Sequence, residues 1–158
     1  MKRVKTGRQR STGDAFAIVA SRYNARYVDA MVRVAIAELK RASVKQIQVV
    51  RVPGAFEIPA VAATLASEQT RRPSAIICIG VIFQGQTSHA QQIGWGVTHA
   101  LAQIQVQYRM PVIHGVFVFE KEEQARVRCL GRKHNRGREA AQTALTMALV
   151  MRSLGQPA

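Results

Sequence analysis

The sequence predicts an α/β domain in which helices cover both faces of a four-stranded parallel sheet. Short apolar runs alternate along the chain with longer segments whose apolar residues recur at helical spacing. Strands separated by helices of this length form βαβ units and pair in parallel. The 158 residues suit one domain, and 47% of them are hydrophobic, which is enough for a core on each side of a sheet. We therefore predict a three-layer α/β/α sandwich with the flavodoxin-like strand order, without linkers or internal repeats.

Apolar runs bounded by polar turns are the predicted strands. The first, AFAIVAS, shows no alternation of polar and apolar residues, which is typical of a strand buried on both faces. Pro53 and Gly54 form a breaker pair directly after the second run. The predicted strands cover residues 15–21, 47–52, 74–83 and 111–119.

Helices are predicted in the segments between and after these runs. In the first of them, Val28, Met31 and Ala35 lie on one helical face. Pro59 is tolerated because it falls in a first turn, and Gly155 is a natural stop after the last helix. The predicted helices cover residues 25–42, 59–67, 88–108, 120–129 and 135–154.

The chain is strongly basic. It has 23 Lys and Arg residues against 9 Asp and Glu residues, a formal net charge of +14. Such a charge favours polyanions or phosphorylated small molecules as partners, although a plain basic surface is also consistent with it. No stretch of about 18 apolar residues occurs, so we expect no membrane span.

The ends of the chain and its cysteines point to a simple organisation. Residues 1–13 are basic, lack a signal-type apolar segment and are expected to form a mobile arm before a domain over 14–158. Cys78 and Cys129 form no metal or redox motif, and Cys78 lies in the apolar run AIICIG as a small buried side chain. We expect a cytoplasmic location, no metal site and no disulfide framework.

The turns that follow the predicted strands carry most of the polar residues that could bind a ligand or take part in catalysis. In sheets of this type, ligands bind beyond the carboxyl ends of the strands. Here those ends lead into SRYNARY, VPGAFEIP, FQGQTSHA and FEKEEQARVRCLGRKHNRG. The third of these turns places His89 where a helix begins. A solvated first-turn histidine is the plain alternative to a catalytic one.

Taken together, these turns resemble the lumazine synthase family. VPGAFEIP is close to a signature of that family, GVIFQGQTSH is similar to its strand-to-helix turn, and EEQARVRCLGRKHNRGREAA is similar to its phosphate-contacting segment. The resemblance implies an enzyme, a transferase that condenses 5-amino-6-(D-ribitylamino)uracil with 3,4-dihydroxy-2-butanone 4-phosphate to 6,7-dimethyl-8-ribityllumazine in riboflavin biosynthesis. It implies neither a metal nor an organic cofactor. The alternative is a catalytically silent, polyanion-binding or cargo-enclosing shell protein of the same fold.

The resemblance implies three catalytic residues. His89 matches the family's catalytic histidine, and an imidazole can take up and release protons near neutral pH. Glu139 matches a glutamate near that histidine, and a helix-surface carboxylate is the alternative for it. Arg128 matches the phosphate-binding arginine, whose planar fork suits phosphate oxygens. Other basic residues nearby leave open that Arg128 is simply solvated.

Phosphate binding is expected at two segments. The turn before His89 offers a glycine that permits unusual backbone torsions, together with polar donors at a helix N-terminus. A simple helix cap would explain Thr87 equally well. The late basic segment supplies the second group, in which Arg132 and Arg136 have weaker claims than Arg128. The expected phosphate-binding residues are Gly85, Gln86, Thr87, Arg128, Arg132 and Arg136.

The pyrimidine and its ribityl chain are expected to lie in an aromatic slot. Tyr23 matches the family's ring-stacking aromatic, and Asn24 matches the polar residue beside it. Phe56 is open to a plain packing role, as are Ile82 and Phe83, and Glu57 to a role as a helix-start acid favoured by the dipole. The expected residues of this slot are Tyr23, Asn24, Ala55, Phe56, Glu57, Val81, Ile82, Phe83 and His114.

Some positions depart from the family pattern. His114 stands where the family usually has Phe, a residue that is donated to a neighbouring subunit's site. Gln84 replaces a commonly basic residue, and Gln86 a small one. The resemblance further implies a homopentamer, a 60-subunit icosahedral capsid as a further expectation, and riboflavin synthase as cargo. The expected small-molecule partners are the substrates and inorganic phosphate, and we expect no nucleic acid partner.

The two long helices indicate association from the sequence itself. Residues 88–108 and 135–154 carry apolar side chains on much of their surfaces. A small domain cannot easily bury both, and large exposed apolar patches mark interfaces. The alternative is that the sheet covers them.

Overall fold

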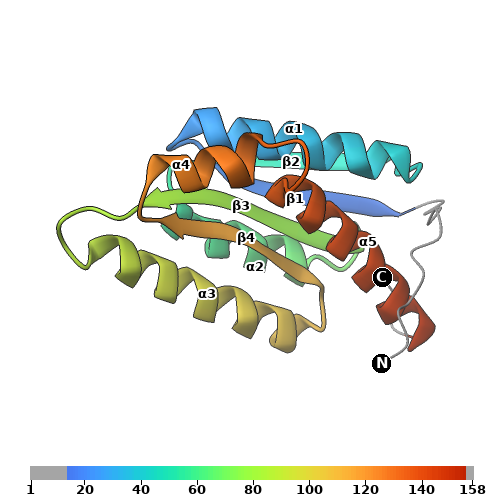
Figure 1. Cartoon of the computed structure of the whole chain (residues 1–158). Helices are drawn as coiled ribbons and strands as arrows, with labels where there is room; N and C mark the ends of the chain where they lie inside the picture. The colour runs from blue at the N-terminus through green and yellow to red at the C-terminus, as the bar shows by residue number, and fades with distance from the viewer. Residues whose placement is uncertain (1–13, 156–158) are drawn as a thin grey trace, which may run out of the picture.

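A computed structural model describes residues 14–155 as a parallel sheet between two layers of helices (Figure 1). The sheet has four strands in the order β2-β1-β3-β4, and every neighbouring pair is parallel. The predicted sandwich and its strand order are therefore confirmed. The predicted basic arm over 1–13 lies outside the described residues. The strands are β1 (Ala15–Ser21), β2 (Gln46–Val52), β3 (Ala75–Phe83) and β4 (Val112–Phe119).

The helices begin and end close to the predicted positions, with two local differences. A 3₁₀ turn precedes the second helix, and the predicted helix over 120–129 is one short α-turn that continues into a π-helical turn. No helix within residues 14–155 is long and apolar enough to cross a bilayer. The elements are α1 (Ala25–Arg41), η1 (Ala55–Glu57), α2 (Ile58–Ser67), α3 (His89–Tyr108), α4 (Glu122–Ala125), η2 (Arg126–Leu130) and α5 (Arg136–Ser153).

The sheet divides the interior into two hydrophobic clusters because successive side chains of a strand point to opposite faces. In β1, Phe16 and Ile18 pack with α1 and α5, whereas Ala17 and Val19 pack with α2 and α3. This two-sided burial explains why β1 lacks polar alternation. Cys78 on β3 is fully buried, as predicted, and burial raises the pKa of its thiol well above the usual range.

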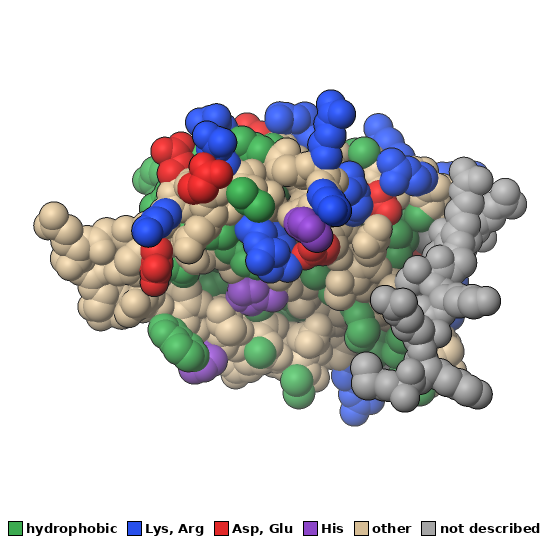
Figure 2. All heavy atoms as spheres, viewed as in Figure 1, with side chains coloured by type: hydrophobic (Ala, Val, Ile, Leu, Met, Phe, Trp, Pro, Cys, Tyr) green, Lys and Arg blue, Asp and Glu red, His purple; other side chains and the backbone are tan. Residues whose placement is uncertain are grey.

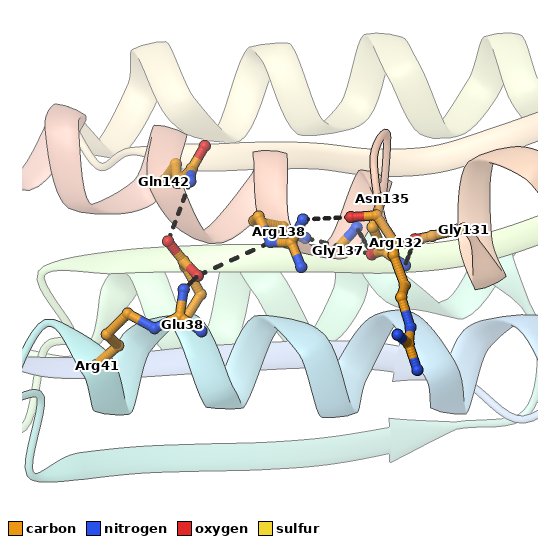
Figure 3. A network of polar contacts seen from close by, with 8 residues as sticks. All are labelled: Glu38, Arg41, Gly131, Arg132, Asn135, Gly137, Arg138 and Gln142. Carbon is orange, nitrogen blue, oxygen red and sulfur yellow. Dashed lines mark hydrogen bonds and ion pairs between the residues drawn. The ribbon is translucent and has the colours of Figure 1, made fainter.

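α1 and α5 approach each other closely at Gly137. A Cβ atom at this position would lie 2.2 Å from the backbone oxygen of Met31. Further along the same contact, the Glu38 carboxylate accepts hydrogen bonds from Arg41 at 2.8 Å and from Gln142 at 3.0 Å (Figure 3). Arg138 lies 4.0 Å from the same carboxylate. A glycine and a shared carboxylate thus set the spacing of the two helices.

Exposed large apolar side chains occur on several elements, and α3 carries the two residues Trp95 and Val106. Trp95 is 66% exposed and Val106 is 77% exposed, whereas Val97 and Leu101 on the opposite side of the helix are buried. The buried face of α5 is formed largely by alanines that pack against the sheet and α1. On α3 the exposed apolar surface is thus limited to these two separate side chains, while the sheet and α1 cover most of the apolar face of α5.

The positive charge gathers on the side of the molecule formed by α1, η2 and the start of α5 (Figure 2). Acidic side chains there already have arginine partners, since Glu122 lies 3.5 Å from Arg26 and Glu123 lies 3.5 Å from Arg126. Basic side chains outnumber these acidic ones, so this side of the molecule keeps a net positive charge. The basic side chains exposed on these elements and in the loop before α5 are Arg26, Arg33, Lys40, Arg41, Arg126, Arg128, Arg132 and Lys133.

We expect Gly137→Ala to destabilise the protein by about 3 kcal/mol. Helix propensity alone would favour alanine by about 1 kcal/mol, so a loss of stability would have to come from the contact with Met31. Gly85→Ala is the matched control, because a Cβ there meets nothing within 4 Å. Urea denaturation should place the control within about 0.5 kcal/mol of the wild type. Equal stability of Gly137→Ala and the wild type would contradict the close approach.

Candidate active site

A cavity of about 690 Å³ opens at the carboxyl ends of β1, β2 and β3. The chain leaves β1 for β2 on one side and later returns to β3 on the other, so the cavity lies at the point where the strand order reverses. Most of the predicted slot lines it, together with His89. The lining residues are Tyr23, Asn24, Gly54, Ala55, Phe56, Glu57, Val81, Ile82, Phe83, His89, Gln92 and Ile93.

Asn24 connects the first wall of the cavity to the sheet. Its backbone is left-handed, with φ 56°, and its side-chain amide donates a 2.7 Å hydrogen bond to the Val81 backbone oxygen. The N–H of Tyr23 donates to the Pro53 oxygen at 3.2 Å. Asn24 therefore joins the start of α1 to β3, and this contact holds the neighbouring Tyr23 at the cavity.

The turn after β2 forms the second wall. The N–H of Gly54 donates a 2.8 Å hydrogen bond to Oε2 of Glu57. A Cβ at Gly54 would lie 2.9 Å from that oxygen and 3.2 Å from the Tyr23 ring, so a larger residue would displace one or both side chains from the cavity wall. Glu57 thus has the cap-like contact expected of a helix-start acid while it also lines the cavity. Phe56 is 64% exposed, which excludes the alternative of plain core packing within this chain.

His89 is the first residue of α3, and its exposed side chain lines the cavity. Its N–H donates to Oγ1 of Thr87 at 3.4 Å. Gln92 and Ile93 also line the cavity but were not among the predicted residues. They follow His89 by three and four positions, and this helical spacing is the sequence signal that indicates a shared face.

The predicted phosphate turn is exposed beside this cavity. Gly85, Gln86 and Thr87 lie at the surface and are not among the cavity's lining residues. Gly85 does not use the unusual torsions that a glycine permits. Within residues 14–155 the glycine with positive φ is Gly155. Gly85 instead lies in open space, so the turn follows an ordinary backbone path there.

Three of the predicted residues lie together in a different cavity, of about 460 Å³, between β4, α3 and α5. They are His114, Arg136 and Glu139. Arg136 donates a 2.5 Å hydrogen bond to Glu139, and its guanidinium lies 5.5 Å from the centre of the Phe117 ring. Within one chain, then, Glu139 does not line the cavity that holds His89.

The imidazole of His114 is held by a neighbouring hydroxyl. Its Nε2 lies 2.9 Å from Oγ1 of Thr98 on α3. Partial burial lowers the pKa of His114, which favours the neutral ring. The ring also meets Phe117 edge-on, with the ring centres 6.4 Å apart. A neutral imidazole in this position can present both an aromatic face and a hydrogen-bonding nitrogen.

The segment that carries the remaining arginines is held by Asn135 (Figure 3). This residue is only 3% exposed and caps α5. Its amide nitrogen donates to the backbone oxygens of Cys129 at 2.7 Å and Gly131 at 3.2 Å, and its oxygen accepts from the Gly137 N–H at 2.9 Å. Asn135 therefore fixes how η2 meets α5.

Arg128 and Arg132 are exposed and line neither of the cavities described above. The backbone oxygen of Arg132 accepts a 2.6 Å hydrogen bond from Arg138 (Figure 3). One chain thus separates the predicted site into the His89 cavity, the His114 cavity and the two exposed arginines. Among residues 14–155 no group of three His, Cys, Asp or Glu side chains is placed to hold a metal ion.

Replacing Asn24 tests the contact that holds the first wall. Asn24→Gly keeps access to the left-handed backbone and loses the bond to Val81, so we expect a loss of about 1 kcal/mol. Asn24→Ala loses the same bond and adds about 1 kcal/mol of backbone strain. Chemical denaturation at one protein concentration should show this order, with alanine less stable than glycine. Two variants as stable as the wild type would show that the bond contributes nothing.

A three-layer α/β/α sandwich whose small-molecule cavity lies at the reversal of strand order is an arrangement typical of ligand-binding α/β enzymes. The model of the 6,7-dimethyl-8-ribityllumazine synthase family matches residues 13–152. The chain therefore belongs to the lumazine synthase family.

Individual relatives agree over nearly the whole chain, and each is named 6,7-dimethyl-8-ribityllumazine synthase. The Stenotrophomonas maltophilia R551-3 protein is 37% identical over 141 residues, which cover 88% of this chain and 90% of that protein. The Pyrococcus furiosus protein is 36% identical over 150 residues, 95% and 93% of the two chains. The Streptomyces coelicolor protein is 35% identical over 151 residues, 94% and 92% of the two chains.

These matches confirm the predicted family, and with it a transferase of riboflavin biosynthesis. They do not favour the alternative of a catalytically silent shell protein. The roles of individual residues stay predictions.

Proposed function

We propose that this chain condenses 5-amino-6-(D-ribitylamino)uracil with 3,4-dihydroxy-2-butanone 4-phosphate and releases 6,7-dimethyl-8-ribityllumazine, phosphate and water. This is the penultimate step of riboflavin biosynthesis. The observation that carries the proposal is the cavity at the reversal of strand order, which gathers Tyr23, Phe56, Glu57 and His89 from three separate turns. A turnover assay that follows the fluorescent lumazine product tests it directly.

The pyrimidine ring is the part of the substrate that suits the aromatic rim. Tyr23 is 70% exposed and Phe56 is 64% exposed, so both rings offer open apolar surface at the cavity. A planar heterocycle covers such surface well, and ring stacking adds to the area effect. Glu57 can accept hydrogen bonds from ribityl hydroxyls with the oxygen that Gly54 does not use. The slot therefore takes the ring and its polyol chain together.

The reaction needs a group that moves protons between substrate atoms. The 5-amino group adds to the ketone, and loss of water forms an imine. Removal of a C–H proton then lets phosphate leave, after which the ribitylamino nitrogen closes the ring and a second water departs. His89 is exposed at the cavity and is the group that we assign to these proton transfers. The rest of the rate enhancement comes from holding the two substrates together.

The leaving phosphate requires an anion site beside His89. The turn of Gly85, Gln86 and Thr87 lies at the N-terminus of α3, where backbone N–H groups and the helix dipole favour an anion. Arg128 adds a guanidinium, supported by the field of Arg132 and Arg136. Since those arginines do not line the His89 cavity of their own chain, we infer that a neighbouring copy supplies them.

A homo-oligomer brings the separated parts together. In this arrangement the cavity with His114, Arg136 and Glu139 faces Tyr23 and Glu57 of the next copy. The exposed Trp95 and Val106 on α3 supply apolar surface for the contact between copies. A ring closes when each copy binds the next through the same rotation. We infer a pentamer in the cytoplasm, with a 60-subunit capsid and riboflavin synthase cargo as its further elaboration.

Replacing His89 with Ala should lower turnover about 100-fold, which is a typical contribution of general acid–base catalysis. Binding of the pyrimidine should change little, because the aromatic rim and Glu57 remain. Steady-state rates and a fluorescence titration of the pyrimidine measure the two effects separately. Full activity of the variant would remove His89 from the mechanism.

Mixing two inactive variants tests the shared site. His89→Ala and Arg128→Ala chains, unfolded and refolded together in equal amounts, should regain roughly a quarter of wild-type activity, because a random ring pairs intact His89 with intact Arg128 at that fraction of its interfaces. Each variant refolded alone is the control. No recovery in mixed rings would place both residues in the same subunit's site.

Light scattering on the mixed sample identifies the ring itself. Five chains of 17.4 kDa give about 87 kDa, and sixty give about 1 MDa. A fully active monomer would contradict the shared site.

A further inference from the structure

We propose that Gln84 is a positioning residue, whose side-chain amide aims the backbone N–H groups of the turn over 85–88 at the phosphate of the substrate. Gln84 follows the last residue of β3, and its own N–H donates a 2.8 Å hydrogen bond to the backbone oxygen of Phe119 on β4. The backbone of Gln84 is therefore anchored to the sheet at the base of the turn. The inference rests on the proposed function, because it assigns a role in the same anion site.

The amide of Gln84 holds two carbonyl groups of the turn. Its Nε2 donates to the Gly85 oxygen at 3.2 Å and to the Thr87 oxygen at 2.8 Å. Both carbonyl groups therefore point toward Gln84. A carbonyl oxygen that pointed toward the anion would repel it, so this arrangement removes an unfavourable contact from the site.

The same two contacts set the direction of two donors. In a planar trans peptide the C=O group and the following N–H group point in opposite directions. When the Gly85 and Thr87 oxygens face Gln84, the N–H groups of Gln86 and Ser88 face away from it. Neither N–H has an acceptor among the described residues. They are thus free donors next to the N-terminus of α3, where an anion is favoured.

The orientation of the Gln84 side chain leaves one polar atom without a hydrogen bond, which lowers the stability of the fold. Oε1 of Gln84 is buried and has no hydrogen-bond partner within the described residues. Exchanging the amide's oxygen and nitrogen would place an oxygen against two carbonyl oxygens, so the observed orientation is the better one. A buried acceptor without a partner is unfavourable. The two hydrogen bonds of the same side chain hold the backbone of the turn in one conformation.

This role differs from the one that a basic side chain, expected at this position from the family resemblance, would have. A lysine or arginine at the end of β3 would add charge to the phosphate site directly. A neutral amide adds no charge and instead arranges neutral donors. The turn also bears Thr87, whose Oγ1 accepts from the His89 N–H at 3.4 Å. Order in the turn therefore extends to the start of the helix that carries His89.

The test compares Gln84→Glu, Gln84→Ala and the matched control Gln91→Ala. Glutamate has nearly the shape of glutamine but has no donor for the two carbonyl groups. Gln91 is exposed on α3, close to the same turn, and donates no hydrogen bond from its side chain among the described residues. Two measurements are made on each full-length protein. One is the KM of each substrate, and the other is the affinity for inorganic phosphate from a calorimetric titration.

We expect Gln84→Glu to raise the KM of the butanone phosphate and the Kd of inorganic phosphate about tenfold or more, because charge-assisted hydrogen bonds are strong. Gln84→Ala should raise both constants less, since it adds no repelling carboxylate. The KM of the pyrimidine should stay within about twofold in every variant, a split that general loss of structure would not produce. Gln91→Ala should behave as the wild type.

Two outcomes separate this inference from the proposed function. Unchanged phosphate constants in both Gln84 variants would overturn the positioning role, even if Arg128→Ala still weakens phosphate binding and the wild type turns over. If Gln84→Ala, which adds no charge, binds inorganic phosphate more weakly than the wild type, and the wild type forms no lumazine, the positioning role is supported and the proposed reaction is overturned.

Discussion

Parallel pairing of β1 with both β2 and β3 is the constraint on which the site depends. It brings the carboxyl ends of three strands to one edge of the sheet, so three turns that are distant in the sequence meet there. Tyr23, Phe56 and His89 come from those three turns and line one cavity. The bond from Asn24 to Val81 shows how the edge is held, since it joins the start of α1 to the strand that leads to His89.

Contacts between main chain and side chain, more than contacts between charged side chains, hold the polar parts of this site. Asn135 binds the backbone on both sides of the loop between η2 and α5, and Gln84 binds two carbonyl groups of the turn before His89. Both residues use a neutral amide that donates to two backbone oxygens, and that of Asn135 also accepts from a backbone N–H. Because a backbone group cannot move without its neighbours, such contacts fix the direction of whole segments. The exposed arginines thus project from a segment whose base is held in place.

The separation of the two cavities gives a physical reason for assembly. His89 lines one cavity, whereas His114, Arg136 and Glu139 line another, between β4, α3 and α5. Strong positive charge on one side of the molecule repels like charges, which is why the assembly that we propose uses the exposed apolar residues of α3 and not the basic side. His114 contributes a hydrogen-bonding ring that Thr98 orients in the second cavity.

The sequence by itself determined the order of strands and helices and the turns that carry chemistry. The uninterrupted apolar run at 15–21 could only suit a strand covered on both faces, and the turns VPGAFEIP and GVIFQGQTSH identified the family. The position of Gln92 and Ile93 in the cavity could also have been predicted from the sequence, because helical spacing places them on the same face as His89. These features are local, so they depend on residues that are neighbours along the chain.

Only the tertiary structure decided which of these residues share a cavity. The distribution of His89 and Glu139 over two cavities depends on how α5 packs against the sheet, and no spacing in the sequence contains that information. The need for glycine at 137 arises from the Met31 oxygen, which lies more than 100 residues earlier in the chain. The hydrogen bond from the Gln84 N–H to the Phe119 oxygen likewise joins segments that are distant in the sequence. Contacts between distant segments form only when the strands pair and the helices pack on the sheet. For that physical reason the sequence pattern could not reveal them.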